Sequence, residues 1–195
     1  MSKQFYMACL DVQGRRCVVV GGGSVGTEKA LGLLACGAQV TVVAPELDAD
    51  LHRAPVVWRP RRYRARDLSG AFLVVAATSD RRVNERVFAD AEARGLLCNV
   101  ADVPDLCNFI LPAVHRQGPI AIAVSTGGAS PALAQRIRSD IAERVGPEHA
   151  ELAEELRAMR PEVKERFATY EERRDYFEEL VTASLDRSSD RGRPS

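Results

Sequence analysis

Short hydrophobic runs alternate with segments of helical periodicity over residues 1–112. Five of these runs predict strands, at 17–20, 40–44, 56–58, 72–77 and 97–100. Between them, apolar residues at helical spacing predict helices at 27–36 and 84–94, each followed by a glycine that suits a helix end. Nearly continuous apolar strands are typical of a parallel sheet buried on both faces. We therefore expect an α/β fold in which helices cover a parallel sheet.

The pattern changes after residue 112. Residues 120–124 predict a further strand, and Ser130 followed by Pro131 predicts the start of a helix that ends near residue 144. Beyond Gly146, hydrophobic residues recur every three or four positions among Glu and Arg, which predicts helices interrupted at Pro161. The polar C-terminus predicts a disordered tail. The expected parts of the chain are 1–112, 113–146, 147–185 and a tail over 186–195.

The composition is that of an ordinary globular protein. The 195 residues include 27 Lys and Arg against 27 Asp and Glu, and 46% of them are hydrophobic. A net charge of zero argues against a dedicated nucleic-acid binder, although it leaves local basic patches open. No apolar run approaches the roughly 20 residues of a membrane span, and the N-terminus lacks the features of a signal peptide. We expect a cytoplasmic protein that binds neither nucleic acid nor membrane.

Metal-ligating residues do not cluster along the sequence. The five cysteines are odd in number, and none has a neighbour at the spacing of a structural zinc site. His115 and His149 also lie apart from cysteines and acidic residues in any ligand pattern. We predict reduced thiols that pack as small hydrophobic groups, and no metal site.

Residues 21–26 have the pattern G-x-G-x-x-G directly after a predicted strand and before a predicted helix. Gly21 permits the tight turn, Gly23 lets the backbone approach a pyrophosphate, and Gly26 allows the helix to pack closely on the strand. The helix N-terminus, which includes Ser24 and Val25, supplies N–H donors and a partial positive charge. In this context the pattern predicts a dinucleotide site.

Residues at the ends of two other strands bear on the choice of dinucleotide. Glu46 follows the second predicted strand and can accept a hydrogen bond from a ribose hydroxyl, and no Arg or Lys follows it closely to receive a 2′-phosphate. NAD is therefore favoured over NADP. Pro45 occupies the usual position of the acid, so Glu46 can also be read as a solvated loop carboxylate. Thr78 ends the fourth strand, and we expect it to face the cofactor through its backbone.

These motifs and several later ones carry a family resemblance. The segments concerned are 18–26, 40–45, 76–80, 98–102, 108–113 and 123–134. In this order they resemble the siroheme synthase N-terminal module, the precorrin-2 dehydrogenase family, some members of which are also sirohydrochlorin ferrochelatases. The resemblance covers about residues 5–180. Glu28 stands where many relatives have Arg, and we expect this departure to be neutral because an acid suits a helix N-terminus.

The resemblance implies an NAD-binding Rossmann domain, a small α+β dimerisation segment and a helical C-terminal domain, assembled as a homodimer. It also implies the reaction, in which NAD takes a hydride from the tetrapyrrole precorrin-2 to give sirohydrochlorin on the way to siroheme. Longer relatives carry a methyltransferase module that this chain does not contain, so we do not expect it to make precorrin-2.

Asp102 lies at the carboxyl end of a predicted strand, where open α/β sheets bind their ligands. In the family motif this Asp is the proposed catalytic residue. It can serve as a general base if burial raises its pKa, or as a group that orients the substrate or a metal. The plain alternative is a loop Asp that caps a turn. Asp105 lies off the motif, and we assign it to the turn after Pro104.

Three further groups of residues are candidates for substrate contact. Asn108 and Phe109 lead into the segment between the domains. A loop of small residues before a helix N-terminus suits an anion or, alternatively, a tight connection within the dimer interface; it comprises Ser125, Thr126, Gly127 and Gly128. Five arginines within eight positions can attract carboxylates or simply form a solvated face; they are Arg59, Arg61, Arg62, Arg64 and Arg66.

Two other functions stay open at this point. A bifunctional enzyme would also insert ferrous iron into sirohydrochlorin, with Asp102 serving either step. A regulatory NAD-sensing module would require the glycine loop, but it would give no reason for the segments 99–102 and 125–134.

Overall fold

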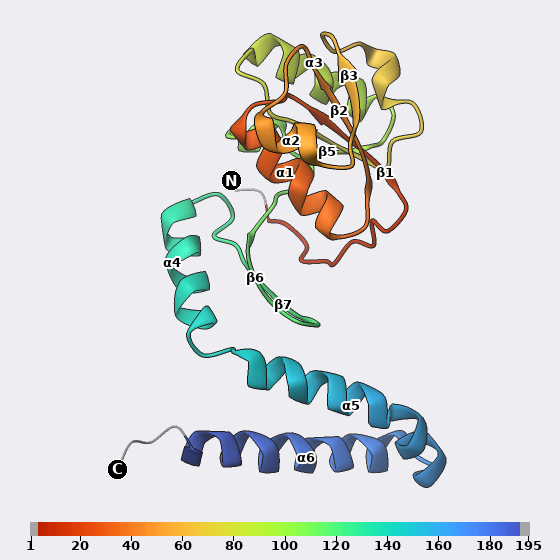
Figure 1. The fold of residues 1–195 in the computed structure, drawn as a ribbon, viewed down its shortest axis with the longest axis vertical. Helices are drawn as coiled ribbons and strands as arrows, with labels where there is room; N and C mark the ends of the chain where they lie inside the picture. The colour runs from red at the N-terminus through yellow and green to blue at the C-terminus, as the bar shows by residue number, and fades with distance from the viewer. Residues whose placement is uncertain (1–3, 192–195) are drawn as a thin grey trace. The chain divides into compact units, whose positions relative to one another are not determined.

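The computed structural model describes residues 4–191, which divide between residues 111 and 112 into two compact units. The first unit is built on a five-stranded sheet with the order β3-β2-β1-β4-β5, in which every pair is parallel (Figure 1). The strands are β1 (Arg16–Val20), β2 (Gln39–Ala44), β3 (Val57–Pro60), β4 (Leu73–Ala76) and β5 (Leu97–Val100). The predicted parallel sheet is confirmed.

Successive residues of the central strand β1 enter two different hydrophobic clusters. Val18 and Val20 pack on one face with residues of α3 (Arg81–Glu92), whereas Cys17 and Val19 pack on the other with Ala30 of α1 (Ser24–Ala35). The strand is therefore buried on both sides, which explains its continuous apolar sequence. Figure 1 shows the two helices on opposite faces of this sheet.

Three short elements of the first unit were not predicted. They are the helix α2 (Ala49–Arg53) and the 3-10 turns η1 (Ala65–Leu68) and η2 (Pro104–Leu106). Elements of three to five residues contain too few positions to show helical periodicity. Each of the three lies in the connection that follows a strand, namely β2, β3 or β5. They therefore shape the loops between the carboxyl end of one strand and the start of the next.

The second unit begins with a hairpin of β6 (Ala113–Gln117) and β7 (Ile120–Val124). The sequence predicted β7 but not β6, because β6 carries His, Arg and Gln and shows no continuous apolar run. A two-residue turn joins the strands, and its first residue, Gly118, has φ +54°, where hairpin turns favour glycine. The helix α4 (Pro131–Ala142) packs on the hairpin. Its N-cap is Ser130, as predicted, and the Ser130 hydroxyl accepts the N–H of Leu133.

Two long helices complete the second unit, α5 (Pro147–Arg166) and α6 (Tyr170–Arg191). The predicted interruption at Pro161 is wrong, because α5 continues through it. Good helix formers surround the proline, and the buried Val163 anchors the last turn against the cost of the lost hydrogen bond. The predicted tail over 186–195 is also wrong as far as residue 191, since polar composition prevents burial and not helix formation; residues 192–195 lie outside the described part.

The predicted fold class, a Rossmann-type parallel sheet followed by a small α+β segment and a helical C-terminal region, is confirmed by this element order. The hairpin, α4 and the two long helices all lie in the second compact unit. The boundary that we expect between residues 113–146 and 147–185 stays a prediction. Within the described residues, every helix is too short or too polar to cross a membrane.

Candidate functional site

A cleft of about 540 Å³ opens at the carboxyl ends of β1, β2 and β4. Its walls come from the glycine loop (21–23), the end of β2 (43–46), the loop after β3 (62–63) and the segment after β4 (77–80), with Val83 of α3. Open parallel sheets bind ligands at this edge, where the strand order reverses around β1. The cleft therefore brings together the glycine loop, Pro45, Glu46 and Thr78.

The glycine loop is packed tightly against its surroundings except at one position. Gly21 has φ +122°, and a Cβ there would lie 2.2 Å from the carbonyl oxygen of Ala77. A Cβ on Gly26 would lie 2.2 Å from the carbonyl oxygen of Gly21, whereas a Cβ on Gly23 would meet no atom within 4 Å. Gly23 is also the N-cap of α1, which no side chain caps. The exposed first turn of α1, with Ser24 and Val25, is thus placed to donate N–H groups to an anion in the open space beside Gly23.

Gly22, to which the motif gives no role, lets the β2–α2 loop pack directly against the glycine loop. A Cβ on Gly22 would lie 2.1 Å from the carbonyl oxygen of Glu46, and the N–H of Asp48 donates to the carbonyl of Gly22 at 2.7 Å. Pro45 and Glu46 are exposed on the wall of the cleft as a result. The sequence signal for this contact was the run of three glycines at 21–23, because the motif requires glycine only at the first and third of these positions.

Thr78 is fixed by a buried side chain of α3. The Oδ1 of Asn84 accepts hydrogen bonds from the amide and the hydroxyl of Thr78, at 3.2 and 2.7 Å, and its Nδ2 donates to the carbonyl of Thr78 at 2.9 Å. The backbone contacts that we expected Thr78 to offer a cofactor are therefore engaged within the protein. Asn84 is only 5% exposed and was missed as a positioning residue, although its place four residues after Asp80 puts it one turn into the helix.

The arginine cluster divides into structural and exposed members. Asp67 is fully buried, and its carboxylate accepts from Arg59, from Arg61 at 2.6 and 2.8 Å, and from the amide of Arg64 at 2.9 Å. Burial alone would raise the pKa of Asp67, but these hydrogen bonds lower it well below its ordinary value. Arg59 and Arg61 thus anchor the loop after β3, while Arg62 faces the cleft.

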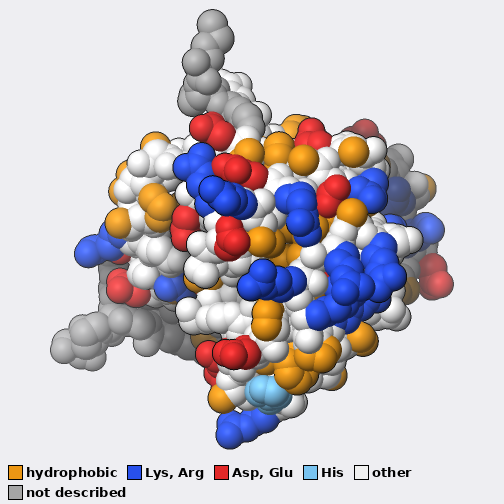
Figure 2. All heavy atoms as spheres, turned by 90° about the horizontal axis from the view of Figure 1, so that it is seen from above, with side chains coloured by type: hydrophobic (Ala, Val, Ile, Leu, Met, Phe, Trp, Pro, Cys, Tyr) orange, Lys and Arg blue, Asp and Glu red, His pale blue; other side chains and the backbone are white. Residues whose placement is uncertain are grey.

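Local basic surface exists although the net charge of the chain is zero. Figure 2 shows Lys and Arg side chains gathered in patches on one face of the molecule, with fewer Asp and Glu side chains between them. Arg62, Arg64 and Arg66 of the cluster are exposed. The interpretation of the cluster as a purely solvated face is therefore wrong for Arg59 and Arg61, which have a buried partner.

Asp102 has the only positive φ, +61°, among the non-glycine residues that the structure describes. Left-handed backbone at a non-glycine residue is uncommon, and Asp is one of the residue types that tolerate it. Its side chain is exposed, so the burial on which a general-base role depends is absent from the single chain. Asp102 follows β5 and is not among the described residues that line the glycine-loop cleft. Asp105 lies in the turn η2, as expected.

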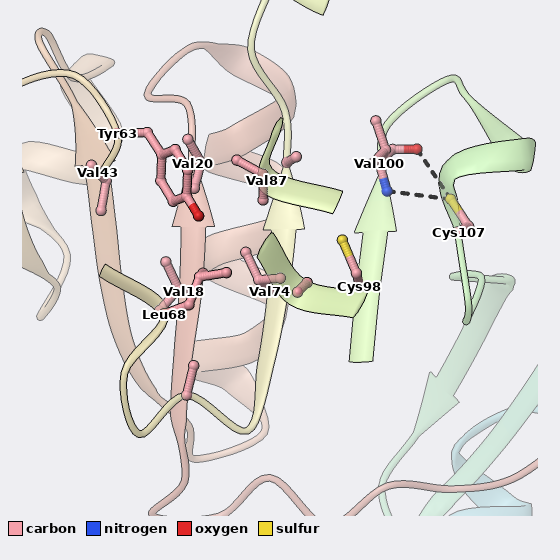
Figure 3. Close-up of a cluster of buried hydrophobic side chains, with 13 residues drawn as sticks. Val18, Val20, Val43, Tyr63, Leu68, Val74, Val87, Cys98, Val100 and Cys107 are labelled. Carbon is pink, nitrogen blue, oxygen red and sulfur yellow. Dashed lines mark hydrogen bonds between the residues drawn. The ribbon is translucent and has the colours of Figure 1, made fainter. Parts of the chain in front are cut away.

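The loop that carries Asp102 is held by Cys107 (Figure 3). The Sγ of Cys107 accepts the amide of Val100 at 3.2 Å and donates to the carbonyl of either Val100 or Val103, both at 3.3 Å. The side chain of Asn99 donates to the carbonyl of Phe109 at 3.1 Å and closes the loop from the other side. The backbone on both sides of Asp102 is thus tied to the end of β5.

Asn108 is exposed and Phe109 is half-buried, and both have contacts within the first unit. The amide side chain of Asn108 accepts from the N–H of Cys98 at 2.7 Å and donates to the carbonyl of Leu96 and to Glu92. The ring of Phe109 packs against one hydrophobic cluster. These contacts hold both residues at the edge of β5, and the substrate contact that we expect of them stays a prediction.

The small-residue loop belongs to the second unit and is closed by its own hydroxyl groups. The hydroxyl of Thr126 accepts the amide of Ser130 at 3.0 Å and donates to its carbonyl, and the hydroxyl of Ser125 accepts the amide of Gly127 at 3.1 Å. Gly127 and Gly128 have φ +62° and +88°. These bonds fix the loop before α4, while Ser125 and the two glycines stay exposed.

The buried cysteines and His115 have structural contacts. Burial raises the pKa of Cys17 to about 11 and, with a contribution from Cys107, that of Cys98 to about 12, so both thiols stay protonated. The Nε2 of His115 lies 2.9 Å from the carbonyl of Val145. Within residues 4–191, no three His, Cys, Asp or Glu side chains are grouped closely enough to hold a metal ion.

Comparison with known proteins gives consecutive matches along the chain. Residues 8–113 match the model of a putative NAD(P)-binding family, residues 117–144 the central region of sirohaem biosynthesis proteins, and residues 148–194 the sirohaem synthase dimerisation region. The first of these models alone matches more than half of the chain.

Curated relatives and a solved structure agree with these matches. The siroheme synthase of Nitrosococcus oceani is 34% identical over 93% of this chain and 40% of its own length, and that of Chromobacterium violaceum is 39% identical over the same shares. The chain therefore spans about two fifths of these relatives. The structure of SirC, a precorrin-2 dehydrogenase, superposes with a TM-score of 0.76 and 29% identity over 91% of this chain and 89% of SirC. The chain belongs to the family of sirohaem biosynthesis proteins that carry an NAD(P)-binding domain, as the resemblance of its motifs implied.

Proposed function

We propose that the chain is an NAD-dependent dehydrogenase that oxidises precorrin-2 to sirohydrochlorin in siroheme biosynthesis. The observation that carries the proposal is the likeness to SirC, named a precorrin-2 dehydrogenase, over nine tenths of both chains. The glycine-loop cleft supports it independently, because it offers a dinucleotide the space beside Gly23 and the N-terminus of α1. The proposed setting is the cytoplasm.

The residues of the cleft fit the cofactor. A Cβ at Gly23 would project into the space that a pyrophosphate requires, and the first turn of α1 supplies N–H donors there. Glu46 is exposed at the end of β2, in a position to accept a hydrogen bond from a ribose hydroxyl, which favours NAD. When bound, NAD supplies the acceptor for the hydride.

Asp102 is the residue we assign to the reaction itself. Oxidation of precorrin-2 to sirohydrochlorin removes a hydride and a proton, and a carboxylate beside the macrocycle can orient the substrate and take the proton. The strained backbone of Asp102 and the bonds of Cys107 hold this carboxylate at a defined place after β5. Because the side chain is exposed in the single chain, orientation of the substrate is the role that the geometry favours.

A homodimer is part of the proposal, since residues 148–194 match the sirohaem synthase dimerisation region. Helices α5 and α6 would form the interface. Sedimentation equilibrium of the full chain tests this point, with twice the 21.3 kDa chain mass as the expected result.

A turnover assay tests the function. Purified protein is incubated with enzymatically made precorrin-2 and NAD in the absence of metal, and NADH and the macrocycle spectrum are followed together. We expect oxidation by the wild type, a loss of about a hundredfold or more in Asp102→Asn, and nearly full activity in Asp105→Asn, the matched control in the adjacent turn. Binding of NAD without oxidation would contradict the proposal and favour a regulatory NAD-sensing module.

The same mixture tests the bifunctional alternative. The curated relatives are named siroheme synthases, and siroheme contains iron, so ferrous ion is added as the second substrate after oxidation is complete. Insertion faster than in a protein-free control would add ferrochelatase activity to the proposed dehydrogenase. Insertion at the control rate would leave this chain with dehydrogenation alone.

A further inference from the structure

A second pocket of about 360 Å³ adjoins the dinucleotide cleft and is lined by three arginines. Arg62, Arg82 and Arg86 face it together with the carboxylate of Asp80. The pocket shares Arg62, Tyr63, Asp80 and Val83 with the cleft, so a ligand in the cleft can reach it.

The lining of this pocket carries more positive than negative charge. Arg62 and Arg82 are exposed, and neither guanidinium forms an ion pair with any residue between 4 and 191. Asp80 is the single acidic residue in the lining, and its Oδ1 accepts the backbone N–H of Arg82 as the cap of α3. Arg86 is already positioned, since it donates to the carbonyl of Tyr63 at 2.8 Å and lies over the Tyr63 ring. Three guanidinium groups against one carboxylate attract an anionic group.

The sheet register places Arg62 beside the end of β2. Ala44 of β2 pairs with Pro60 of β3, and Glu46 and Arg62 each follow two residues beyond this pair. Both line the same cleft. Glu46 occupies the region that reads the adenosine ribose, and an arginine near that region is the group that accommodates a 2′-phosphate in this class of fold. Arg62 lies 16 residues after Glu46 in the chain, so its place beside the end of β2 depends on the pairing of β2 with β3.

We propose that Arg62, Arg82 and Arg86 form an anion-binding subsite of the dinucleotide cleft, which takes the 2′-phosphate of NADP, so that the chain binds NADP in addition to NAD. The proposal rests on the proposed dinucleotide function. A carboxylate side chain of the tetrapyrrole is also anionic and is the other source of an anion for this subsite. The experiment separates the two sources.

Calorimetric titration with 5′-ADP and 2′,5′-ADP tests the phosphate source without turnover. We expect the wild type to bind 2′,5′-ADP at least as tightly as 5′-ADP, and Arg62→Ala and Arg82→Ala to bind 2′,5′-ADP about tenfold more weakly while they keep the affinity for 5′-ADP. Arg66→Ala is the matched control, because Arg66 is exposed in the same segment and lines neither pocket. Arg86 is left unchanged because it also holds Tyr63.

Turnover with saturating NAD tests the carboxylate source. A KM for precorrin-2 that rises about tenfold in Arg62→Ala and Arg82→Ala, with kcat nearly unchanged, supports the subsite with the substrate as its ligand. If both variants keep the 2′,5′-ADP affinity and the KM of the wild type, or if they weaken binding of 5′-ADP and 2′,5′-ADP equally, the subsite is overturned. Failure of the wild type to bind 5′-ADP at all would instead contradict the proposed dinucleotide function, and the subsite with it.

Discussion

The side chain of Asn84 in α3 forms hydrogen bonds with Thr78, which follows β4. Its Oδ1 accepts from the Thr78 hydroxyl at 2.7 Å, and its Nδ2 donates to the Thr78 carbonyl at 2.9 Å. The amide of Thr78 also points to the same Oδ1. A single buried side chain thus links the first turn of a helix to one wall of the dinucleotide cleft. The position of that wall depends on α3 as much as on the sheet.

Asn84→Ala should therefore affect both stability and cofactor binding. We expect the free energy of unfolding to fall by about 1–3 kcal/mol, because the amide and carbonyl of Thr78 lose their partner in a partly buried place. Affinity for NAD should fall at the same time. Urea denaturation and calorimetry measure the two effects, and the exposed neighbour Glu85→Ala serves as control. Unchanged NAD affinity in Asn84→Ala would show that the wall at Thr78 does not contact the cofactor.

Gly22 and Gly23 allow a matched pair of substitutions. Gly22→Ala should destabilise the fold and displace the loop of Glu46, because its Cβ would lie 2.1 Å from a carbonyl oxygen. Gly23→Ala should leave the unfolding free energy within about 1 kcal/mol of the wild type, because its Cβ meets no protein atom and its φ is −81°. It should nevertheless weaken NAD binding at least tenfold, since the Cβ enters the space for the pyrophosphate.

Gly32→Ala is the control for this pair. Gly32 lies exposed in α1 with nothing near its Cβ position, so this variant should be slightly more stable and bind NAD normally. Thermal unfolding and a calorimetric Kd are measured for the three variants. Normal NAD binding by Gly23→Ala would contradict the placement of the cofactor beside the loop.

Cys107 should influence turnover although its thiol takes no part in the chemistry. Cys107→Ala removes the sulfur that bonds the backbone at Val100 and Val103 on both sides of Asp102. We expect kcat to fall severalfold with NAD affinity retained, and stability to fall by about 1–2 kcal/mol. Cys9→Ala, at an exposed thiol, should behave as the wild type. An equal loss of kcat and of NAD affinity would indicate general damage to the domain rather than displacement of Asp102.

Asp67 should make stability depend on acid pH. Its pKa lies below the ordinary Asp value of about 3.9, because hydrogen bonds from Arg61, Arg64 and Arg59 outweigh the effect of burial. The stabilisation is therefore complete above that ordinary value and is lost as pH falls below it toward the folded-state pKa. Asp67→Asn should lose about 2–3 kcal/mol at pH 7 and lose this part of the acid dependence.

Urea denaturation between pH 7 and pH 3 checks the expectation for Asp67. The exposed Arg136–Asp140 pair provides the control, since Asp140→Asn should change stability by less than about 0.5 kcal/mol. An Asp67→Asn variant with the stability and the pH profile of the wild type would show that Arg59 and Arg61 do not depend on this carboxylate.

Several features were predictable from sequence because they are local. The apolar runs of β1, β2 and β4 indicated strands buried on both faces, and Ser130 with Pro131 marked the start of α4. The glycine loop was recognisable because its order of strand, loop and helix is contained in one stretch of chain.

The features that sequence reasoning missed depend on tertiary register. Glu46 and Arg62 are far apart in sequence and line the same cleft because β2 and β3 pair in parallel. The burial of Asp67, which removes Arg59 and Arg61 from the exposed cluster, requires the fold of the loop after β3. The polar strand β6 has no hydrophobic signature of its own and is defined by its partner β7.

The most direct test of the central claim is a single turnover under anaerobic conditions. Protein in excess over precorrin-2 is mixed with NAD, and NADH and sirohydrochlorin are quantified in the same sample over time. We expect one NADH to appear for each sirohydrochlorin, at the same rate, and both products to be lost together in Asp102→Asn. Sirohydrochlorin formed without NADH, or NAD bound without either product, would contradict this expectation.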